Sequence, residues 1–204
     1  MPQPKIRPSR SERALAGSFL RSFLQNPKQV ASIIPSSRFV VKKVASKMDL
    51  TKPRVIAEFG PGEGVVTREI LRRSPAGTRM ILFELNEVLY KLLRDEFADD
   101  ERVEVLHEDA RNIVRIAEER GITGFDYIFS GIPFSLMDPK PKQELMYQIY
   151  EGLVPGGSFI IYQVTNELKR YGQHFDKIKS EWAPMNIPPY FITVYHKSQE
   201  NGAK

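Results

Sequence analysis

Three glycines at alternate positions, Gly60, Gly62 and Gly64, follow a short apolar run at residues 55–59. A short run rich in β-branched residues is typical of a buried strand, and the amphipathic segment after the glycines, residues 66–73, is typical of a helix. Glycine has no Cβ, so a turn built from it lets the backbone come close to a bound molecule. These residues therefore predict a strand–turn–helix unit that binds a nucleotide-type ligand.

The spacing of the glycines argues against a dinucleotide ligand. A dinucleotide-binding turn of the form G-x-G-x-x-G would place its third glycine at position 65. The chain has Val65 at that position, and the glycine comes one residue earlier, at Gly64. The turn is therefore not expected to hold a pyrophosphate.

Acidic residues end or follow the next two predicted strands. Glu84 ends the apolar run at residues 79–84, and Asp109 follows the run at residues 102–106. In a doubly wound sheet, the carboxyl ends of neighbouring parallel strands meet at one edge, where a carboxylate can accept hydrogen bonds from both hydroxyls of a ribose. We predict that Glu84 binds a ribose and that Asp109 accepts a hydrogen bond from an adenine amino group. A solvated acid at the strand end is the alternative for Glu84.

The rest of the chain predicts strands and helices that alternate in one α/β domain. Between residues 39 and 196 we expect helix 39–48, strand 55–59, helix 66–73, strand 79–84, helix 86–97, strand 102–106, strand 125–129, helix 139–153, strand 158–164, helix 171–179, strand 181–186 and strand 190–196. Residues 153–157 are expected to form a turn. In helix 86–97, the side chains expected to face inward are Val88, Leu89, Leu92 and Leu93. The loop at residues 130–134 leaves the sheet at the same edge as the glycine turn, so it should flank the reacting group.

Bulk composition excludes several classes of protein. The 204 residues are 41% hydrophobic and 27% charged, which is ordinary for a soluble globular protein. The absence of cysteine excludes disulfides, thiolate metal sites and a cysteine nucleophile, and it suits a reducing cytoplasm. No apolar run approaches the roughly 18 residues that span a bilayer, and the basic N-terminus lacks the apolar core of a signal peptide. The protein is therefore expected to be cytoplasmic.

Positive charge is concentrated in the N-terminal residues 1–47. They contain ten Lys or Arg against one acid, Glu12, a local charge of +9; with +5 for the whole chain, residues 48–204 carry −4. We expect residues 1–47 to form a basic helical extension and residues 48–204 to form the ligand-binding α/β domain. This asymmetry indicates a polyanionic partner, either nucleic acid or an anionic membrane.

An amphipathic helix is predicted at residues 9–25. Ser9 and Glu12 have the spacing of a capping box, and an apolar face follows, made of Leu15, Ala16, Phe19, Leu20, Phe23 and Leu24. Such a helix either docks its apolar face on the core or lies in the interface of an anionic membrane. Each basic residue near an anionic surface contributes roughly 1 kcal/mol to binding. A second helix start at Ser36 or Ser37 is explained by capping, and a ligand contact becomes possible there if the segment folds over the glycine turn.

The glycine turn and the acids occur in an order that resembles the class I S-adenosylmethionine (SAM)-dependent methyltransferases. The matching motifs, over residues 54–196, are Glu58-Phe59-Gly60-Pro61-Gly62-Glu63-Gly64, Glu84, Asp109-Ala110 and Leu153-Val154-Pro155-Gly156-Gly157. The resemblance implies SAM as cofactor and a Rossmann-like sheet of seven strands, the last antiparallel. We predict cofactor contacts from Glu58, Gly60, Pro61, Gly62, Gly64, Glu84, Leu85, Asp109, Ala110, Ser130 and Ser36.

A narrower resemblance, to bacterial phospholipid N-methyltransferases, spans nearly the whole chain. Its motifs are Ile34-Pro35-Ser36-Ser37, the run from Gly60 to Thr67, Ser130-Gly131-Ile132-Pro133 and Asn186-Ile187-Pro188-Pro189. That family converts phosphatidylethanolamine through mono- and dimethyl forms to phosphatidylcholine, and its basic N-terminal helix binds anionic lipid. The resemblance implies a phospholipid substrate and attachment to the inner face of the membrane through residues 9–25.

The rival resemblance is to rRNA adenine dimethyltransferases. Those enzymes place Asn-Leu-Pro-Tyr or a close variant after the fourth strand, where the Asn binds the target amino group and the aromatic residue stacks on the flipped base. This chain has Ser130 in place of the Asn, followed by Ile132, Pro133 and Phe134. We also expect it to lack the extra C-terminal helical domain of those enzymes. An RNA or small-molecule amine methyltransferase is thus the alternative, and a SAM-binding protein without catalysis is a third possibility.

Methyl transfer to an amine needs positioning and the removal of a proton. The sulfonium of SAM is already electrophilic, so the protein must align the amine lone pair with the methyl group and exclude water. The acceptor is an ammonium at neutral pH and must lose a proton first. The candidates for catalytic residues are Ser130, Tyr162 and Asn186. No spacing of His, Asp and Glu indicates a metal site, and none is needed for this chemistry.

Overall fold

The computed structural model describes residues 38–134, 137–163, 165–183 and 190–199, and residues 35–204 form one compact unit. Three of the predicted features lie outside the described residues, namely the amphipathic helix at residues 9–25, Ser36 and Asn186. The boundary predicted between residues 47 and 48 stays a prediction.

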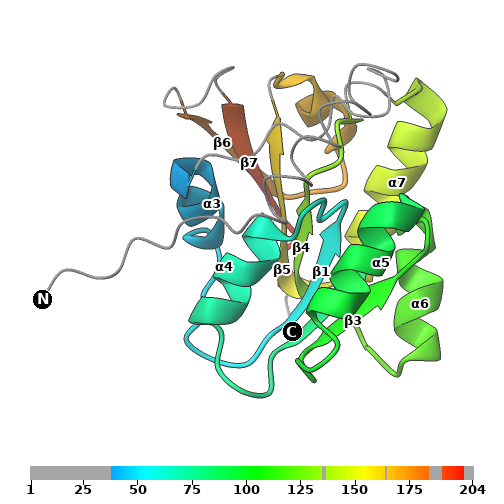
Figure 1. Ribbon diagram of the computed structural model, residues 1–204. Helices are drawn as coiled ribbons and strands as arrows, with labels where there is room; N and C mark the ends of the chain where they lie inside the picture. The colour runs from blue at the N-terminus through cyan, green and yellow to red at the C-terminus, as the bar shows by residue number, and fades with distance from the viewer. Residues whose placement is uncertain (1–37, 135–136, 164, 184–189, 200–204) are drawn as a thin grey trace, which may run out of the picture. The chain divides into compact units, whose positions relative to one another are not determined.

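Within the described residues, seven strands form one mixed sheet. They are β1 (Val55–Phe59), β2 (Arg79–Phe83), β3 (Val103–Leu106), β4 (Phe125–Ser130), β5 (Leu153–Gln163), β6 (Lys177–Ala183) and β7 (Tyr190–His196). Their order across the sheet is β3-β2-β1-β4-β5-β7-β6 (Figure 1). Neighbours from β3 to β5 pair in parallel, whereas β7 is antiparallel to both β5 and β6. The predicted Rossmann-like sheet with an antiparallel last strand is confirmed.

Helices cover both faces of this sheet (Figure 1). They are α3 (Arg38–Ala45), α4 (Val65–Arg73), α5 (Glu87–Glu96), α6 (Ile113–Glu119) and α7 (Pro139–Gly152), with two short 3-10 helices, η1 (Ala110–Asn112) and η3 (Glu167–Tyr171). Ile56 of β1 packs in one apolar core with residues of α3, α4 and α5, and Ala57 packs in the other with residues of α6 and α7. Because both faces are covered, the central strands are mainly apolar, with Glu58 of β1 and Ser130 of β4 as buried polar exceptions.

The helix predicted at residues 171–179 was wrong, because η3 comes earlier and β6 begins at Lys177. The strand predicted at residues 181–186 is present over residues 181–183 as the end of β6, and residues 184–186 lie outside the described residues. Lys177, Lys179 and Glu181 alternate with less exposed residues, which is the period of a strand at the edge of a sheet. The pairing that selects this conformation is with β7, from Lys177 opposite His196 onward. The pairing with β7, which comes later in the sequence, therefore determines that this segment is a strand.

Two further differences concern α5 and β5. Leu89 and Leu93 are buried as expected, but Val88 is 67% exposed and Leu92 is 39% exposed, so the inward assignment of these two was wrong. The apolar stripe of α5 is wider than the surface it covers. Residues 153–157, expected to form a turn, are the first part of β5, and the pairing with β4 shifts register between Phe125 and Tyr127. Helix α6 was not predicted.

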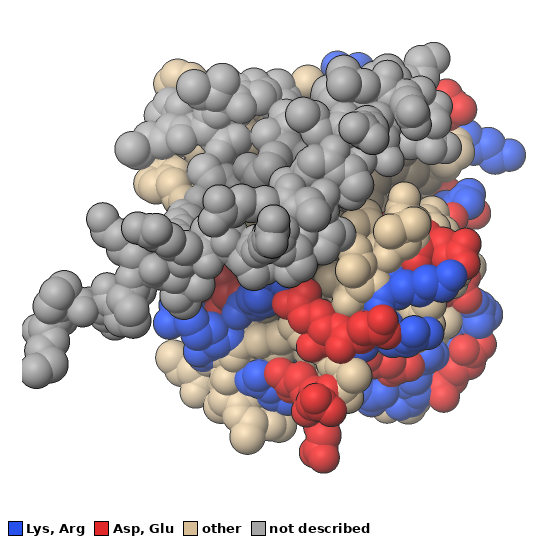
Figure 2. Space-filling view, viewed as in Figure 1, with Lys and Arg blue, Asp and Glu red and all other residues tan. Residues whose placement is uncertain are grey.

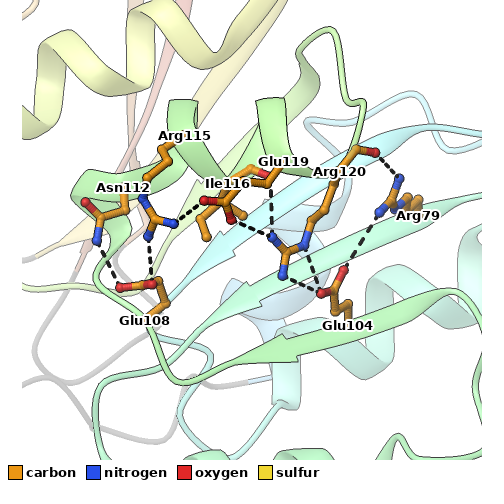
Figure 3. A network of polar contacts seen from close by, with 8 residues as sticks. All are labelled: Arg79, Glu104, Glu108, Asn112, Arg115, Ile116, Glu119 and Arg120. Carbon is orange, nitrogen blue, oxygen red and sulfur yellow. Dashed lines mark hydrogen bonds and ion pairs between the residues drawn. The ribbon is translucent and has the colours of Figure 1, made fainter.

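A network of charged residues fixes α6 and the loop after β3. Arg120, directly after α6, donates two hydrogen bonds to Glu104 of β3, at 2.8 and 2.6 Å, and Arg115 of α6 reaches Glu108 at 2.8 Å (Figure 3). Asn112 also donates to Glu108, at 2.9 Å. Partly exposed ion pairs contribute little free energy one by one, about 0–1 kcal/mol each. Because several such contacts act together here, they fix Glu108 and therefore the loop that carries the adjacent Asp109.

The charges of the described residues are mixed in sign. On the face shown in Figure 2, Lys and Arg lie interspersed with Asp and Glu over the helices that cover the sheet. Such a surface does not by itself attract a polyanion strongly, because opposite charges screen one another. Within the described residues, no helix is both long enough and apolar enough to cross a bilayer.

Candidate cofactor and acceptor site

The glycine turn between β1 and α4 has the backbone that the three glycines predict. Gly60, Gly62 and Gly64 have φ of 64°, 60° and 71°, in the left-handed region that favours glycine. At Gly64, a Cβ would lie 3.0 Å from Cδ2 of Leu93, so α5 packs directly on the backbone. At Gly60, a Cβ would lie 3.1 Å from Cγ1 of Ile132, in the loop after β4. The turn is therefore pressed between two elements, and a larger residue would displace one of them.

Glu84 lies against this turn. The N–H of Gly62 donates to Oε2 of Glu84 at 3.3 Å, and the N–H of Asn86 donates to Oε1 at 2.8 Å. Burial raises the pKa of Glu84, and the N–H groups of Asn86 and Gly62 act in the opposite direction. The sequence placed Gly62 and Glu84 at one edge of the sheet, and the structure brings them into contact. A carboxylate held in this way has lone pairs left for the hydroxyls of a ribose.

Glu58 supports the turn from inside the protein. It is only 1% exposed, and Oγ1 of Thr67, in the first turn of α4, donates to its Oε2 at 2.7 Å. Burial raises the pKa of Glu58 to about 7; the Thr67 hydrogen bond opposes this shift, and the charge of Glu84 adds to it. The contact seen for Glu58 ties β1 to α4, and its predicted contact with the cofactor stays a prediction.

Replacement of Glu58 by glutamine is expected to remove a pH dependence of stability. Because folding raises this pKa from its ordinary value of 4.5 to about 7, the stability linked to the proton is full below pH 4.5 and is lost as the pH rises through about 7. A shift of this size corresponds to at most about 3 kcal/mol. In urea unfolding, the wild-type protein should lose more stability than Glu58→Gln between about pH 5 and about pH 8. Equal losses in the two proteins would contradict this explanation.

Leu85 lies in the loop after β2, and Asp109 lies in the loop after β3. Asp109 caps η1: its Oδ1 accepts from the N–H of Arg111 at 2.8 Å, and the Arg111 guanidinium lies 2.7 Å from Oδ2. Pairing with Arg111 lowers the pKa of Asp109. An adenine amino group would share this carboxylate with Arg111. Ala110 is buried. Leu85 is 63% exposed and gives an apolar surface next to Glu84, while His107 reaches the Leu85 carbonyl at 3.0 Å.

The loop after β4 packs on the glycine turn. The N–H of Gly131 donates to the carbonyl of Phe59 at 2.9 Å, and a Cβ at Gly131 would lie 2.9 Å from the carbonyl oxygen of Gly60. The same Cβ would lie 3.4 Å from the Tyr162 hydroxyl oxygen, so Tyr162 lies beside this loop, and its predicted catalytic role stays a prediction. Ser130 is fully buried, and its Oγ accepts from the N–H of Ile132 at 3.1 Å. Its observed contact is thus within the loop.

Two residues of the site were missed by the sequence analysis. Thr67 holds Glu58, and Gly131 lets the loop approach Gly60. A glycine directly after a strand that ends at the ligand edge is a signal for close backbone approach, and it could have singled out Gly131. A threonine on the buried side of a helix next to a strand acid is a weaker signal. Within the described residues, no group of three His, Asp or Glu could hold a metal ion.

Similarity to known proteins agrees with this geometry. Residues 18–117 match the family model of ribosomal RNA adenine dimethylases. The ornithine lipid N-methyltransferase of Singulisphaera acidiphila is 29% identical over 175 residues, which cover 84% of this chain and 90% of that protein. Ribosomal RNA small subunit methyltransferase A of Thermotoga petrophila is 25% identical over 127 residues, which cover 62% of this chain but 45% of that protein.

A solved structure shows the same fold with a cofactor product in place. The 1,6-didemethyltoxoflavin-N1-methyltransferase of Burkholderia thailandensis, in complex with S-adenosylhomocysteine, has a TM-score of 0.65 at 18% identity, over 98% of this chain and 94% of that chain. The fold, the glycine turn with its facing acid, and these similarities define a class I methyltransferase. The chain is a SAM-dependent enzyme of this class.

Proposed function

We propose that the chain is an N-methyltransferase that transfers methyl groups from SAM to the amine of phosphatidylethanolamine and of its methylated forms at a membrane surface. The observation that carries this proposal is the similarity to a lipid N-methyltransferase over 84% of this chain and 90% of that protein. The match to an rRNA methyltransferase leaves more than half of that protein uncovered. Ser130 also stands where rRNA adenine dimethyltransferases have the Asn that binds the base.

The geometry supports a division of the sheet edge into two parts. SAM supplies a methyl group on an electrophilic sulfonium sulfur. In this proposal, Glu84 holds the nucleoside at the carboxyl ends of β1 and β2, where the glycines let the backbone come close to it. The acceptor amine then approaches from the ends of β4 and β5, past Gly131 and Tyr162. Positioning of this kind can supply roughly 7–11 kcal/mol of the barrier.

The acceptor must lose a proton before its lone pair can attack. Tyr162 is one described candidate, because a Cβ at Gly131, in the loop that packs on the glycine turn, would lie 3.4 Å from its hydroxyl oxygen. Its ring is fixed by stacking on Phe129, at a centroid distance of 5.7 Å, and by an edge contact with Tyr190. A fixed hydroxyl can accept a proton from the ammonium while it releases its own hydroxyl proton to water, which leaves a neutral amine and an unchanged tyrosine. Asn186 and Ser130 stay as the other predicted catalytic residues.

A second candidate function is methylation of RNA. It is favoured by the rRNA adenine dimethylase family model, which matches residues 18–117, and by the basic N-terminal residues, which could contact phosphates. Incubation with methyl-labelled SAM and separate extracts of total lipid and total RNA tests both functions. The lipid proposal expects label in aminophospholipid. Label confined to RNA would refute it.

Removal of residues 1–25 is expected to release the protein from anionic vesicles. We propose that residues 9–25 hold the cytoplasmic protein peripherally at the inner face of the membrane, where about 1 kcal/mol for each basic residue favours binding. In flotation assays, the intact chain should float with vesicles containing phosphatidylglycerol, and the truncated chain should not. Activity on vesicles of phosphatidylethanolamine and phosphatidylglycerol should fall at least about tenfold. Unchanged flotation and activity would contradict the membrane role of this segment.

A further inference from the structure

The carboxyl ends of β5 and β6 and the amino end of β7, which lies between them, carry a row of three side chains. In the register of the sheet, Gln163 of β5 lies opposite Phe191 of β7, and Phe191 lies opposite Trp182 of β6. Residues directly opposite one another in a sheet present their side chains on the same face. We call these three residues the end row. They combine one amide group with two aromatic rings.

The end row continues the core face that α6 and α7 cover. Ile161, Tyr195 and Ile178 belong to the apolar cluster on that face. Each is two or four residues away from a member of the end row on its own strand, and strand side chains alternate with a period of two. The end row is therefore on the same face of the sheet, at its outer edge.

This edge is the one at which the acceptor would approach. Strands β1, β4 and β5 are parallel, so their carboxyl ends share an edge with the glycine turn. Strand β6 runs in the same direction, because both β5 and β6 are antiparallel to β7. Glu84 follows β2, on the other side of β1. The end row therefore lies on the acceptor side of β4, away from the nucleoside-binding side.

Gln163 has an unused hydrogen-bond acceptor. Its side chain is 7% exposed, and its Oε1 has no hydrogen-bond partner among the residues that the structure describes. Buried amide oxygens normally accept a hydrogen bond, so an unpaired one at a ligand-binding edge indicates a missing donor. Trp182, by contrast, is 59% exposed. The end row thus combines a buried acceptor with an accessible aromatic surface.

In the described strands around the end row, and in η3 and the turn after it, every carboxylate already has a partner within the protein. Among the described acids of η3, β6 and the turn between them, Glu167 binds Lys142 at 3.0 Å, Asp176 accepts from the N–H of Ser198, and Glu181 pairs with Lys43 and Lys47. This matters for an amine substrate, because a nearby free carboxylate would keep it protonated and remove its lone pair. An amide oxygen and aromatic rings bind an amine without that effect.

We propose that Gln163, Phe191 and Trp182 form the subsite for the amine head group of an aminolipid. This inference rests on the proposed function. The Gln163 carbonyl accepts a hydrogen bond from an N–H of the neutral amine, which leaves the nitrogen lone pair free to form the new N–C bond as the S–C bond of SAM breaks. The aromatic faces hold the methylated ammonium that results, since cations bind over aromatic rings.

The subsite makes the contribution of Gln163 depend on how many methyl groups the amine already carries. A neutral primary or secondary amine has an N–H to donate, but a neutral tertiary amine has none. Gln163 therefore assists the first and second methyl transfers and not the third. A residue that only supported the fold would affect all three transfers alike.

The test measures kcat/KM with phosphatidylethanolamine and with its mono- and dimethyl forms in uncharged mixed micelles. Gln163→Leu is expected to lower kcat/KM by about tenfold or more for the first two acceptors and to leave the dimethyl form within about twofold. Gln173→Leu, at an exposed position, is the matched control and should change none of them. Equal losses with all three acceptors, or no loss, would overturn the subsite alone. No transfer by the wild-type protein to any of the three lipids would overturn the proposed function, and the subsite with it.

Trp182 allows an independent measurement, because it is the only tryptophan in the chain. Dihexanoyl phosphatidylcholine, below its micelle-forming concentration, presents the methylated head group without further reaction. Its addition should change the Trp182 emission in a saturable way, whereas dihexanoyl phosphatidylglycerol, which has no amine, should not. Equal changes with both lipids, or none with either, would overturn the assignment of Trp182 to the head group.

Discussion

Gly62→Val is expected to abolish SAM binding, with a loss of affinity of at least about 100-fold in calorimetric titration. Gly62 has φ of 60°, a conformation that a β-branched residue rarely adopts. Its N–H also donates to Glu84, so a change in the backbone would move the acid as well as the turn. The substitution would therefore disturb both the glycine turn and the position of Glu84, the two features that we propose bind the nucleoside.

The control for Gly62→Val is Gly121→Val. Gly121 has nearly the same backbone conformation, with φ of 62°, but no atom lies within 4 Å of the position of its Cβ. It follows α6, away from the glycine turn. The two variants should therefore show similar strain in thermal unfolding, and only Gly62→Val should lose SAM binding. Normal SAM affinity in a folded Gly62→Val protein would refute the site.

Glu84→Ala is expected to weaken SAM binding by about 10- to 100-fold, because hydrogen bonds to a charged group are worth about 1.5–3 kcal/mol. The matched control is Glu87→Ala, which removes an exposed acid paired with Lys91 and should leave SAM affinity unchanged. Glu84→Gln keeps one acceptor oxygen, so its SAM affinity should lie between that of the wild-type protein and that of Glu84→Ala.

A ligand variant separates the two tasks that Glu84 performs. If Glu84 binds the ribose, S-adenosylhomocysteine lacking the 2′ hydroxyl should lose affinity for the wild-type protein but little more for Glu84→Ala. The two changes would then be non-additive, as expected for groups in contact. Full additivity would show that Glu84 acts only by holding the N–H of Gly62, and would contradict ribose binding.

Local patterns sufficed to predict the part of the site that we propose binds the cofactor. The apolar run of β1, the alternate glycines and the amphipathic α4 follow one another along the chain, so each constrains the next. Glu84 was predicted from the general geometry of parallel strands, and its contact with Gly62 agrees. The tie from Glu58 to Thr67 was not predicted, because it depends on which face of α4 meets β1.

The acceptor side could not be read from the sequence in the same way. Gln163, Phe191 and Trp182 come from three strands, and they meet only because β7 inserts between β5 and β6. No local pattern fixes that register. For Ser130, the structure shows a buried hydroxyl that accepts from the N–H of Ile132, and its predicted contact with the ligand stays a prediction. The position of a polar residue after a strand does not determine the direction in which its side chain points.

The two outer strands of the sheet have a further consequence, for self-association. An edge strand exposes unpaired N–H and C=O groups to which another chain can add. At one edge, β3 is only four residues long, and its Glu104 is held by Arg120. At the other, β6 places the exposed Lys177 and Lys179 on its solvent side. Short length and positive charge both disfavour strand addition, so an open sheet of this size can stay unpolymerised at the concentrations of a cell.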